Sequence, residues 1–220
     1  NVSAERFVNT DITVSRSIIA EVLTEGGHEA GDPETGDHSR GMNLSRGADR
    51  VSVHHNLFMS NNRRNPHLVG CAGGARRCRP EWAVNPAFDV RCNLVYNWGE
   101  EALHAAAGPR VNVVDNLFLR GPDTLRCVPP ISIDDREPSW DTRLHVAGNL
   151  DSALGHDQAA LVRSRPGVAA TLVPEPFPAP PVEPCTALEL RAQAAEWGAR
   201  PAGPVDRRLL AELAAGRGNL

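Results

Sequence analysis

The 220-residue sequence has no apolar run that approaches the ~20 residues of a bilayer-spanning helix, so it predicts no membrane protein. Its first residues also predict no leader, because Asn1–Arg6 has neither a charged start followed by an apolar stretch nor an initiating Met. We therefore expect a mature or truncated piece of a longer chain. Hydrophobic residues make up 41% and charged residues 23%, which excludes a disordered chain.

The sequence also has no excess of positive charge. Its formal net charge of −4 gives no indication of a nucleic-acid binder, although local basic clusters could meet an acidic sugar polymer. The five cysteines contain no C-x-x-C pair, which disfavours a zinc site. Cys71 and Cys78 lie in one Gly/Arg-rich loop that a disulfide could close, whereas the sequence alone does not pair Cys92, Cys127 and Cys185.

An eight-residue repeat organises the first two thirds of the chain. Its first, third and seventh positions are apolar, and its copies begin at Ile12, Val51, Phe88, Val111 and Leu144. Its sixth position is polar in every copy: Ser17, Asn56, Asn93, Asn116 and Asn149. Apolar alternation with period two predicts a strand with one buried face, followed here by a polar bend and a second short strand.

Asn suits such a bend because it tolerates left-handed backbone geometry and its amide can bond the backbone. Stacked coils would place the Asn side chains above one another, where each amide can bond the next. This pattern predicts a β-solenoid whose coils bury a core only when stacked, and it disfavours a β-sandwich.

The copies start 39, 37, 23 and 33 residues apart, and the 23-residue step is typical of an uninterrupted coil. We therefore predict an all-β, right-handed parallel β-helix over residues 1–165, with inserted loops at 25–46, 61–86 and 121–143. Inserted loops are where solenoids usually build a binding face.

The composition of the sequence changes near Pro166, where the repeat ends. We predict a Pro-rich segment and a helical cap over residues 166–220, packed on the same domain. Thr186–Trp197, with Glu189 three residues after its cap, and Pro204–Leu213 are predicted helices. They are expected to cover the end of the stack, where strand edges would otherwise stay unpaired.

The stretch after the second repeat carries a specific resemblance. Val51–Phe58 contains His-His-Asn and is followed by Arg64-Asn-Pro-His67. This order resembles the pectate lyases, polysaccharide lyase family 1, in which V-x-F-H-H-N-x-F precedes R-x-P-R. Val90–Gly99, which ends in Tyr-Asn-Trp-Gly, resembles a later strand of that family, and the ending at Val205–Leu209 resembles its bacterial members. The resemblance covers nearly the whole chain and implies that an N-terminal part of the family precedes Asn1.

Such a resemblance implies a secreted or periplasmic, monomeric enzyme that cleaves a polyuronate such as pectate by Ca²⁺-assisted β-elimination. A base must remove the proton beside the sugar carboxylate, a cation must neutralise that carboxylate, and positive groups must hold the polymer. The implied partner is an acidic polysaccharide, with neither nucleic acid nor membrane.

Arg64 matches the arginine that the family uses as base. Arginine normally stays protonated, so this role demands a strongly perturbed environment, and the alternative is that Arg64 only binds a substrate carboxylate. Arg40 falls where the family has a substrate-binding lysine, and His67 replaces a second arginine, a loss of charge for which Arg63 could compensate. We thus predict Arg64 as catalytic and Arg40, Arg63 and His67 as substrate-binding.

The Ca²⁺ ligands stay unassigned. Calcium needs several carboxylate oxygens, and the resemblance implies that most of the family's ligands lie upstream of Asn1 or just at it. Ser3 stands at one aspartate position of the family, and Glu5 and Glu21 are possible contributors. His54 and His55 invite a metal interpretation, but neighbours on a strand face opposite sides, which favours structural roles for both.

Two alternatives remain open. The departures at His67 and Ser3 favour a non-catalytic or degenerate carbohydrate-binding β-helix. A glycoside hydrolase is disfavoured, because its two carboxyls must lie about 6.5–9.5 Å apart when it inverts. The acidic motifs that match it superficially, Asn9–Asp11 and Asp134-Asp135, lie several repeats apart.

Overall fold

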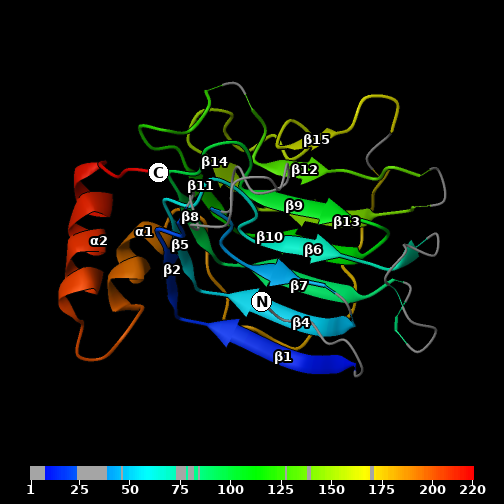
Figure 1. Ribbon diagram of the computed structural model, residues 1–220, viewed down its shortest axis with the longest axis horizontal. Helices are drawn as coiled ribbons and strands as arrows, with labels where there is room; N and C mark the ends of the chain where they lie inside the picture. Colours follow the sequence, from blue (N-terminus) through cyan, green and yellow to red (C-terminus); the bar gives the residue numbers. More distant parts are fainter. Residues whose placement is uncertain are drawn as a thin grey trace, which may run out of the picture.

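The computed structural model describes residues 8–23, 39–45, 47–72, 78, 82–83, 85–126, 128–137, 140–168 and 171–220. Their strands stack in parallel, coil upon coil, into three sheets that surround one core (Figure 1). None of the helices among these residues is long and apolar enough to cross a bilayer.

The three sheets contain only parallel pairings between named strands. The first sheet runs in the order β1 (Asn9–Ser15), β4 (Ala48–His54), β7 (Ala87–Arg91), β10 (Arg110–Val114), β13 (Arg143–Ala147), β16 (Thr171–Leu172). The second runs β14 (Leu150–Asp151), β11 (Leu117–Leu119), β8 (Leu94–Tyr96), β5 (Leu57–Met59), β2 (Ile18–Ala20). The third runs β15 (Val162–Ser164), β12 (Ile131–Ile133), β9 (Leu103–Ala106), β6 (His67–Val69), β3 (Asn43–Leu44).

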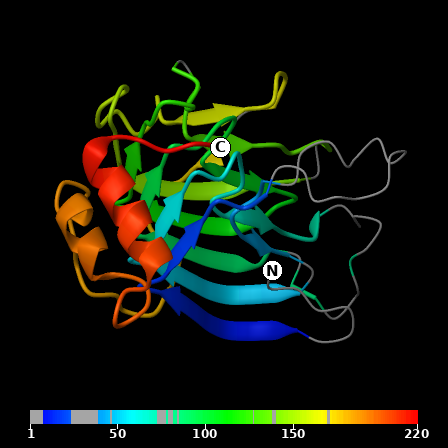
Figure 2. The same cartoon turned by 60° about the vertical axis from the view of Figure 1, so that its left-hand side comes forward.

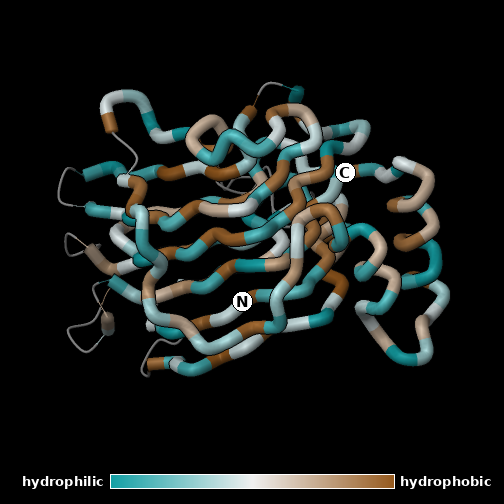
Figure 3. Tube along the Cα trace, turned by 180° about the vertical axis from the view of Figure 1, so that it is seen from behind, coloured by the Kyte–Doolittle hydropathy of each residue, from teal (hydrophilic) through white to brown (hydrophobic). Residues whose placement is uncertain are grey.

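The chain visits one strand of each sheet in turn, which confirms the predicted parallel β-helix. Each sequence repeat supplies a strand of the first sheet and the following strand of the second. Its first positions lie in register on neighbouring coils, as in Val51 beside Phe88 and Phe88 beside Val111, and they point into the core. The alternation of apolar and polar residues along these strands is visible in Figure 3. Each such buried side chain contributes roughly 1.5–3 kcal/mol.

A ladder of buried amides runs through the turns between the first and second sheets. The Nδ2 group of Asn56 donates to Asn93 Oδ1 at 3.0 Å, Asn93 to Asn116 Oδ1 at 3.1 Å, and Asn116 to Asn149 Oδ1 at 3.0 Å. Each of these oxygens also accepts the backbone N–H of the Asn one coil earlier, and Gln158 Oε1 takes over as the acceptor beyond Asn149. The predicted stacking of the Asn side chains is confirmed.

The left-handed residue of each turn is the one before the Asn, which corrects the expectation that the Asn itself adopts this geometry. Positive φ angles occur at the fifth repeat position: Arg16, His55, Cys92, Asp115 and Gly148. The reason is that the amide must point inward to reach its neighbour, so the preceding residue has to turn the chain.

This turn also overturns the expectation that His54 and His55 face opposite sides. His54 ends β4, whereas His55 is the left-handed turn residue, and their Nδ1 atoms lie 3.0 Å apart. Burial lowers the pKa of both rings below the ordinary value of histidine. Both are packed against their surroundings, in keeping with structural roles.

The C-terminal helices lie along the flank of the solenoid rather than across its end, contrary to expectation (Figure 2). They are α1 (Leu190–Gln193), the 3-10 turn η2 (Ala194–Glu196) and α2 (Pro204–Ala215). The second sheet requires this cover because its outward side chains are apolar: Leu57, Met59, Leu94 and Tyr96 pack against Leu190, Leu209 and Leu213.

The predicted helix at Pro204–Leu213 is confirmed and is slightly longer. The helix expected over Thr186–Trp197 begins later, at Leu190, so Thr186 does not cap it. The two residues are still in contact, since Glu189 Oε2 accepts from the Thr186 N–H at 2.9 Å and from Thr186 Oγ1 at 2.8 Å. The domain division at residues 165 and 166 stays a prediction.

Two disulfides form among the described residues. Cys71 pairs with Cys78, as the loop composition suggested, and Cys92 pairs with Cys185 across 93 positions of sequence. The second bond ties the C-terminal tail to the turn between β7 and β8. Cys127 lies outside the described residues.

Replacing one amide should destabilise the whole stack. In Asn93→Ala, the backbone N–H and the Nδ2 group of Asn56 lose their shared acceptor, and the carbonyls of Val53 and Arg91 lose a donor. We expect the free energy of unfolding to fall by about 2–4 kcal/mol in urea titration, because unsatisfied buried groups are costly. The control Asn219→Ala, at an exposed position, should change it by less than about 0.5 kcal/mol. Equal stability of the two variants would contradict a structural role for the ladder.

Candidate active site

The third sheet presents a row of polar side chains on its outer face. The strand register places one member on each of five coils: Asn43, His67, His104, Ser132 and Arg163. Their neighbours along the strands, such as Leu68 and Ala105, are buried in the core. Side chains alternate along a strand, so the row faces away from the core.

The row is joined by contacts from coil to coil. His67 Nδ1 lies 2.9 Å from Asn43 Oδ1, and the ring centroids of His67 and His104 are 4.6 Å apart. Glu101 connects the other half of the row. It accepts from His104 Nδ1 at 2.7 Å and from Ser132 Oγ at 2.7 Å, on different oxygens.

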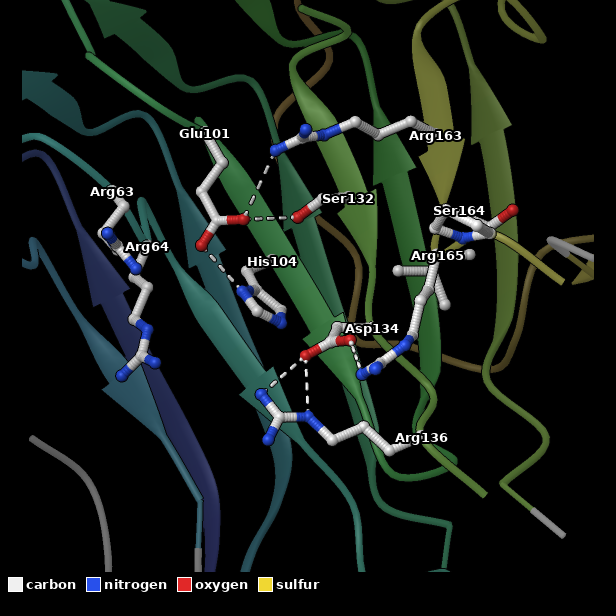
Figure 4. A pocket seen from close by; sticks show the side chains of 12 residues that line it. Arg63, Arg64, Glu101, His104, Ser132, Asp134, Arg136, Arg163, Ser164 and Arg165 are labelled. Atoms are coloured by element: carbon white, nitrogen blue, oxygen red, sulfur yellow. Dashed lines mark hydrogen bonds and ion pairs between the residues drawn. The ribbon is translucent and has the colours of Figure 1, made fainter. Parts of the chain in front are cut away.

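A groove of about 320 Å³ opens over this row (Figure 4). Its lining includes the carboxylates Glu101 and Asp134 and five arginines: Arg63, Arg64, Arg136, Arg163 and Arg165. Asp134 is held between two of these guanidinium groups, 2.9 Å from Arg136 and 3.3 Å from Arg165. All 23 Lys/Arg positions of the chain are arginine, so every fixed cation in the groove is a planar fork suited to carboxylates.

Arg64 lies in the turn three residues before β6. Its φ of 64° is in the left-handed region, as at the other turn residues of the solenoid such as His55. Its Nε is buried and has no hydrogen-bond partner among the residues described. Burial lowers the pKa of Arg64 below its ordinary value, and the charges of Arg40, Arg63 and Arg136 lower it further against the opposing effect of Glu101. The direction of this shift is the one that a base role requires, while the role itself stays a prediction.

The other predicted site residues surround Arg64. Arg63 lines the groove and pairs with Glu100 at 2.6 Å, and Arg40 forms a parallel β-bridge with Arg63. His67 follows Arg64 by three residues and belongs to the polar row. The charges of Arg64 and Arg40 help to lower its pKa. The structure therefore brings the four residues together, while their roles stay predictions.

Sequence reasoning missed the half of the groove that lies on the later coils: Glu101, His104, Ser132, Asp134, Arg136, Arg163 and Arg165. These residues follow turns of different lengths and share no repeat frame. The one signal in the sequence is Asp134-Asp135, which matches a hydrolase motif only superficially. Only Asp134 lines the groove, because Asp135 is buried and accepts from Thr142 and from the Ala107 N–H. Asp11 lies on the first sheet, paired with Arg50, so the structure does not bring the two acidic motifs together.

The described residues do not fit a calcium ion. Both groove carboxylates are engaged by cationic or hydrogen-bonding side chains, and Glu21 pairs with Arg208 of α2 at 2.7 Å instead of facing the groove. Ser3 and Glu5 lie outside the described residues. The cluster of metal-ligating types found within the described ranges is His55, Cys92 and Cys185, whose two cysteines form a disulfide.

Fold and groove together define a parallel β-helix protein with a cationic groove on its third sheet. No protein-family model matches the chain. Over 119 residues it is 33% identical to a protein named probable pectate lyase C from Aspergillus flavus. The match covers 52% of this chain and 22% of that protein, so the chain spans well under half the length of the relative that it matches.

Acid should weaken the fold through His67. Burial, His104 and the nearby arginines lower the pKa of His67 well below 6.5, so the unfolded chain binds its proton first as the pH falls. The contribution of the neutral His67 ring to the free energy of unfolding is therefore fully present above pH 6.5. As the pH falls below 6.5, the free energy of unfolding decreases by up to about 1.4 kcal/mol per pH unit.

This loss is measurable by urea unfolding between pH 7.5 and pH 5. We expect His67→Gln to flatten the pH dependence, whereas His156→Gln, at an exposed position, keeps it. His54 and His55 contribute in the same direction but are present in both proteins. A wild-type slope in His67→Gln would contradict this account of the ring.

Proposed function

We propose that the chain carries the substrate groove of a polysaccharide lyase that cleaves a polyuronate, such as pectate, by β-elimination. The observation that carries the proposal is Arg64, a partly buried guanidinium with a lowered pKa in a groove rich in arginine. The distant likeness to a protein named pectate lyase supports the same class of reaction. The implied location is extracellular, and the implied form is a monomer acting on an acidic polysaccharide.

In this reaction, Arg64 removes the proton from the sugar carbon that bears the carboxylate. That proton becomes acidic only when the carboxylate charge is offset, which the guanidinium groups of Arg136, Arg163 and Arg165 can do from the other side of the groove. The electron pair left on carbon then expels the glycosidic oxygen on the neighbouring carbon and leaves an unsaturated sugar.

The polymer would lie across the coils. Neighbouring strands are about 4.8 Å apart, so groove cations on different coils are spaced along the solenoid axis. Arg63 and Arg64 lie two coils before Arg136, and Arg163 lies on the coil after Arg136. Arg40 and His67 lie beside Arg64 but are not among the residues that line the groove, so their assignment to substrate binding requires the polymer to reach past its lining.

Calcium assistance belongs to the proposal through the family resemblance alone. Because the described residues do not form a calcium site, no step is assigned to the ion, and its contribution would be to offset the substrate carboxylate. Chelation tests this directly.

We expect the wild-type chain to release unsaturated uronate from polygalacturonate, followed by its ultraviolet absorbance, with Ca²⁺ and then with excess chelator. Arg64→Ala should lower the rate by about 10²–10⁴-fold, the usual contribution of a positioned acid or base. The matched control is Arg50→Ala, which removes an exposed arginine of the first sheet and should leave the rate unchanged. Chelator should abolish turnover if calcium assists.

Two results would redirect the proposal. A folded protein that binds polygalacturonate without releasing unsaturated product would favour the non-catalytic carbohydrate-binding alternative. Reducing ends released without ultraviolet absorbance would indicate hydrolysis.

A further inference from the structure

His104 and Glu101 form a pair within the groove that the proposed mechanism leaves without a role. The carboxylate oxygen Oε1 of Glu101 accepts from His104 Nδ1 at 2.7 Å, and the two side chains are only 11% and 10% exposed. Ser132 Oγ donates to the other carboxylate oxygen at 2.7 Å. The position of the His104 ring is thereby fixed at two points, by the backbone of β9 and by the hydrogen bond to Glu101.

This arrangement sets the protonation pattern of the imidazole. Burial opposes ionisation of Glu101, but hydrogen bonds from His104 and Ser132 and the charge of Arg63 lower its pKa below the ordinary value overall. An ionised carboxylate only accepts, so the proton on Nδ1 stays between His104 and Glu101. The other nitrogen, Nε2, points away from Glu101 and has no hydrogen bond to any residue that the structure describes (Figure 4). Because His104 lines the groove, Nε2 is the ring nitrogen left open to a substrate atom.

We propose that His104 is the acid that protonates the departing glycosidic oxygen, and that Glu101 positions it. The assignment rests on the proposed β-elimination. Arg64 takes the proton from carbon 5, the electron pair of that bond forms the double bond between carbons 4 and 5, and the bond from carbon 4 to the glycosidic oxygen breaks. Its electron pair stays on the oxygen, which takes the proton from His104 Nε2. The step begins with neutral Arg64 and with a proton on both ring nitrogens of His104, and it ends with protonated Arg64 and neutral His104. Water then takes a proton from Arg64, and a proton from water returns to Nε2.

Other groups of the groove are less suited to this step. Arg64 is the base of the same step, and Arg136 and Arg165 are engaged by Asp134. Asp134 accepts from two guanidinium groups, and Ser132 already donates to Glu101. His67 has its Nδ1 against Asn43, and its pKa is lowered by burial and by His104, so it stays neutral. His104 alone combines a carboxylate partner with a second nitrogen toward which no described side chain donates or accepts.

The leaving group provides the test. A sugar alkoxide needs a proton to depart, whereas a nitrophenolate does not. We therefore compare oligogalacturonate with a uronate that bears a nitrophenyl ether at carbon 4. His104→Gln should lose at least about 100-fold in kcat on oligogalacturonate, in line with general acid catalysis, and less than about 10-fold on the nitrophenyl substrate. Glu101→Gln should show the same dependence on the leaving group, with a smaller loss and little change in KM.

The matched control is His145→Gln, which removes a histidine from the outer face of the first sheet and should change neither rate. Equal losses on both substrates would overturn the acid role, since a merely structural histidine affects both alike. Unchanged rates in His104→Gln would overturn it as well. A wild-type chain that releases no unsaturated product from either substrate overturns the proposed function itself, a result distinct from failure of the His104 variant alone.

Discussion

The ladder of buried amides is the constraint on which the rest of the structure depends. Each Asn side chain bonds the backbone and the side chain of the next coil, so neighbouring coils cannot slip by one residue without breaking it. Such a slip would also turn every inward side chain outward. The register that the ladder fixes also sets the positions of the groove residues. His67 follows Asn56 by 11 residues, and His104 follows Asn93 by the same 11, so the register at one turn stacks the two rings on the third sheet.

The outer faces of the three sheets differ in what covers them. The second sheet is covered by the C-terminal helices and is held by the Cys92–Cys185 disulfide, because its outward side chains are apolar. The first sheet is crossed by the Pro-rich segment, where Asn112 and Phe177 exchange hydrogen bonds. The third sheet carries short strands with polar, charged outer positions and keeps the groove. The location of the site therefore follows from which faces the tail has to bury.

This division also explains how much could be predicted from sequence. The repeat frame spans the first and second sheets, so it predicts the stacked coils and the Asn ladder. Strands of the third sheet are two to four residues long and follow turns of unequal length, so no shared pattern marks His104, Ser132 or Arg163. The Cys92–Cys185 pairing and the lateral position of the helices depend on which remote surfaces meet, which local patterns do not encode. Arg64 was found only because a motif surrounds it.

An arginine that acts as base poses an electrostatic problem that the groove helps to solve. Burial and neighbouring guanidinium groups lower the pKa of Arg64, but an incoming carboxylate would raise it again by stabilising the protonated form. Arg64 can lose its proton in the complex only if other cations take up the charge of the substrate. Besides Arg64, the groove holds four arginines, which face three carboxylates and so leave a net positive charge: Arg63 pairs with Glu100, Arg163 lies 3.8 Å from Glu101, and Arg136 and Arg165 share Asp134. In the proposed reaction, the surplus of guanidinium groups therefore serves two purposes, since it offsets the sugar carboxylate and thereby keeps Arg64 able to accept a proton.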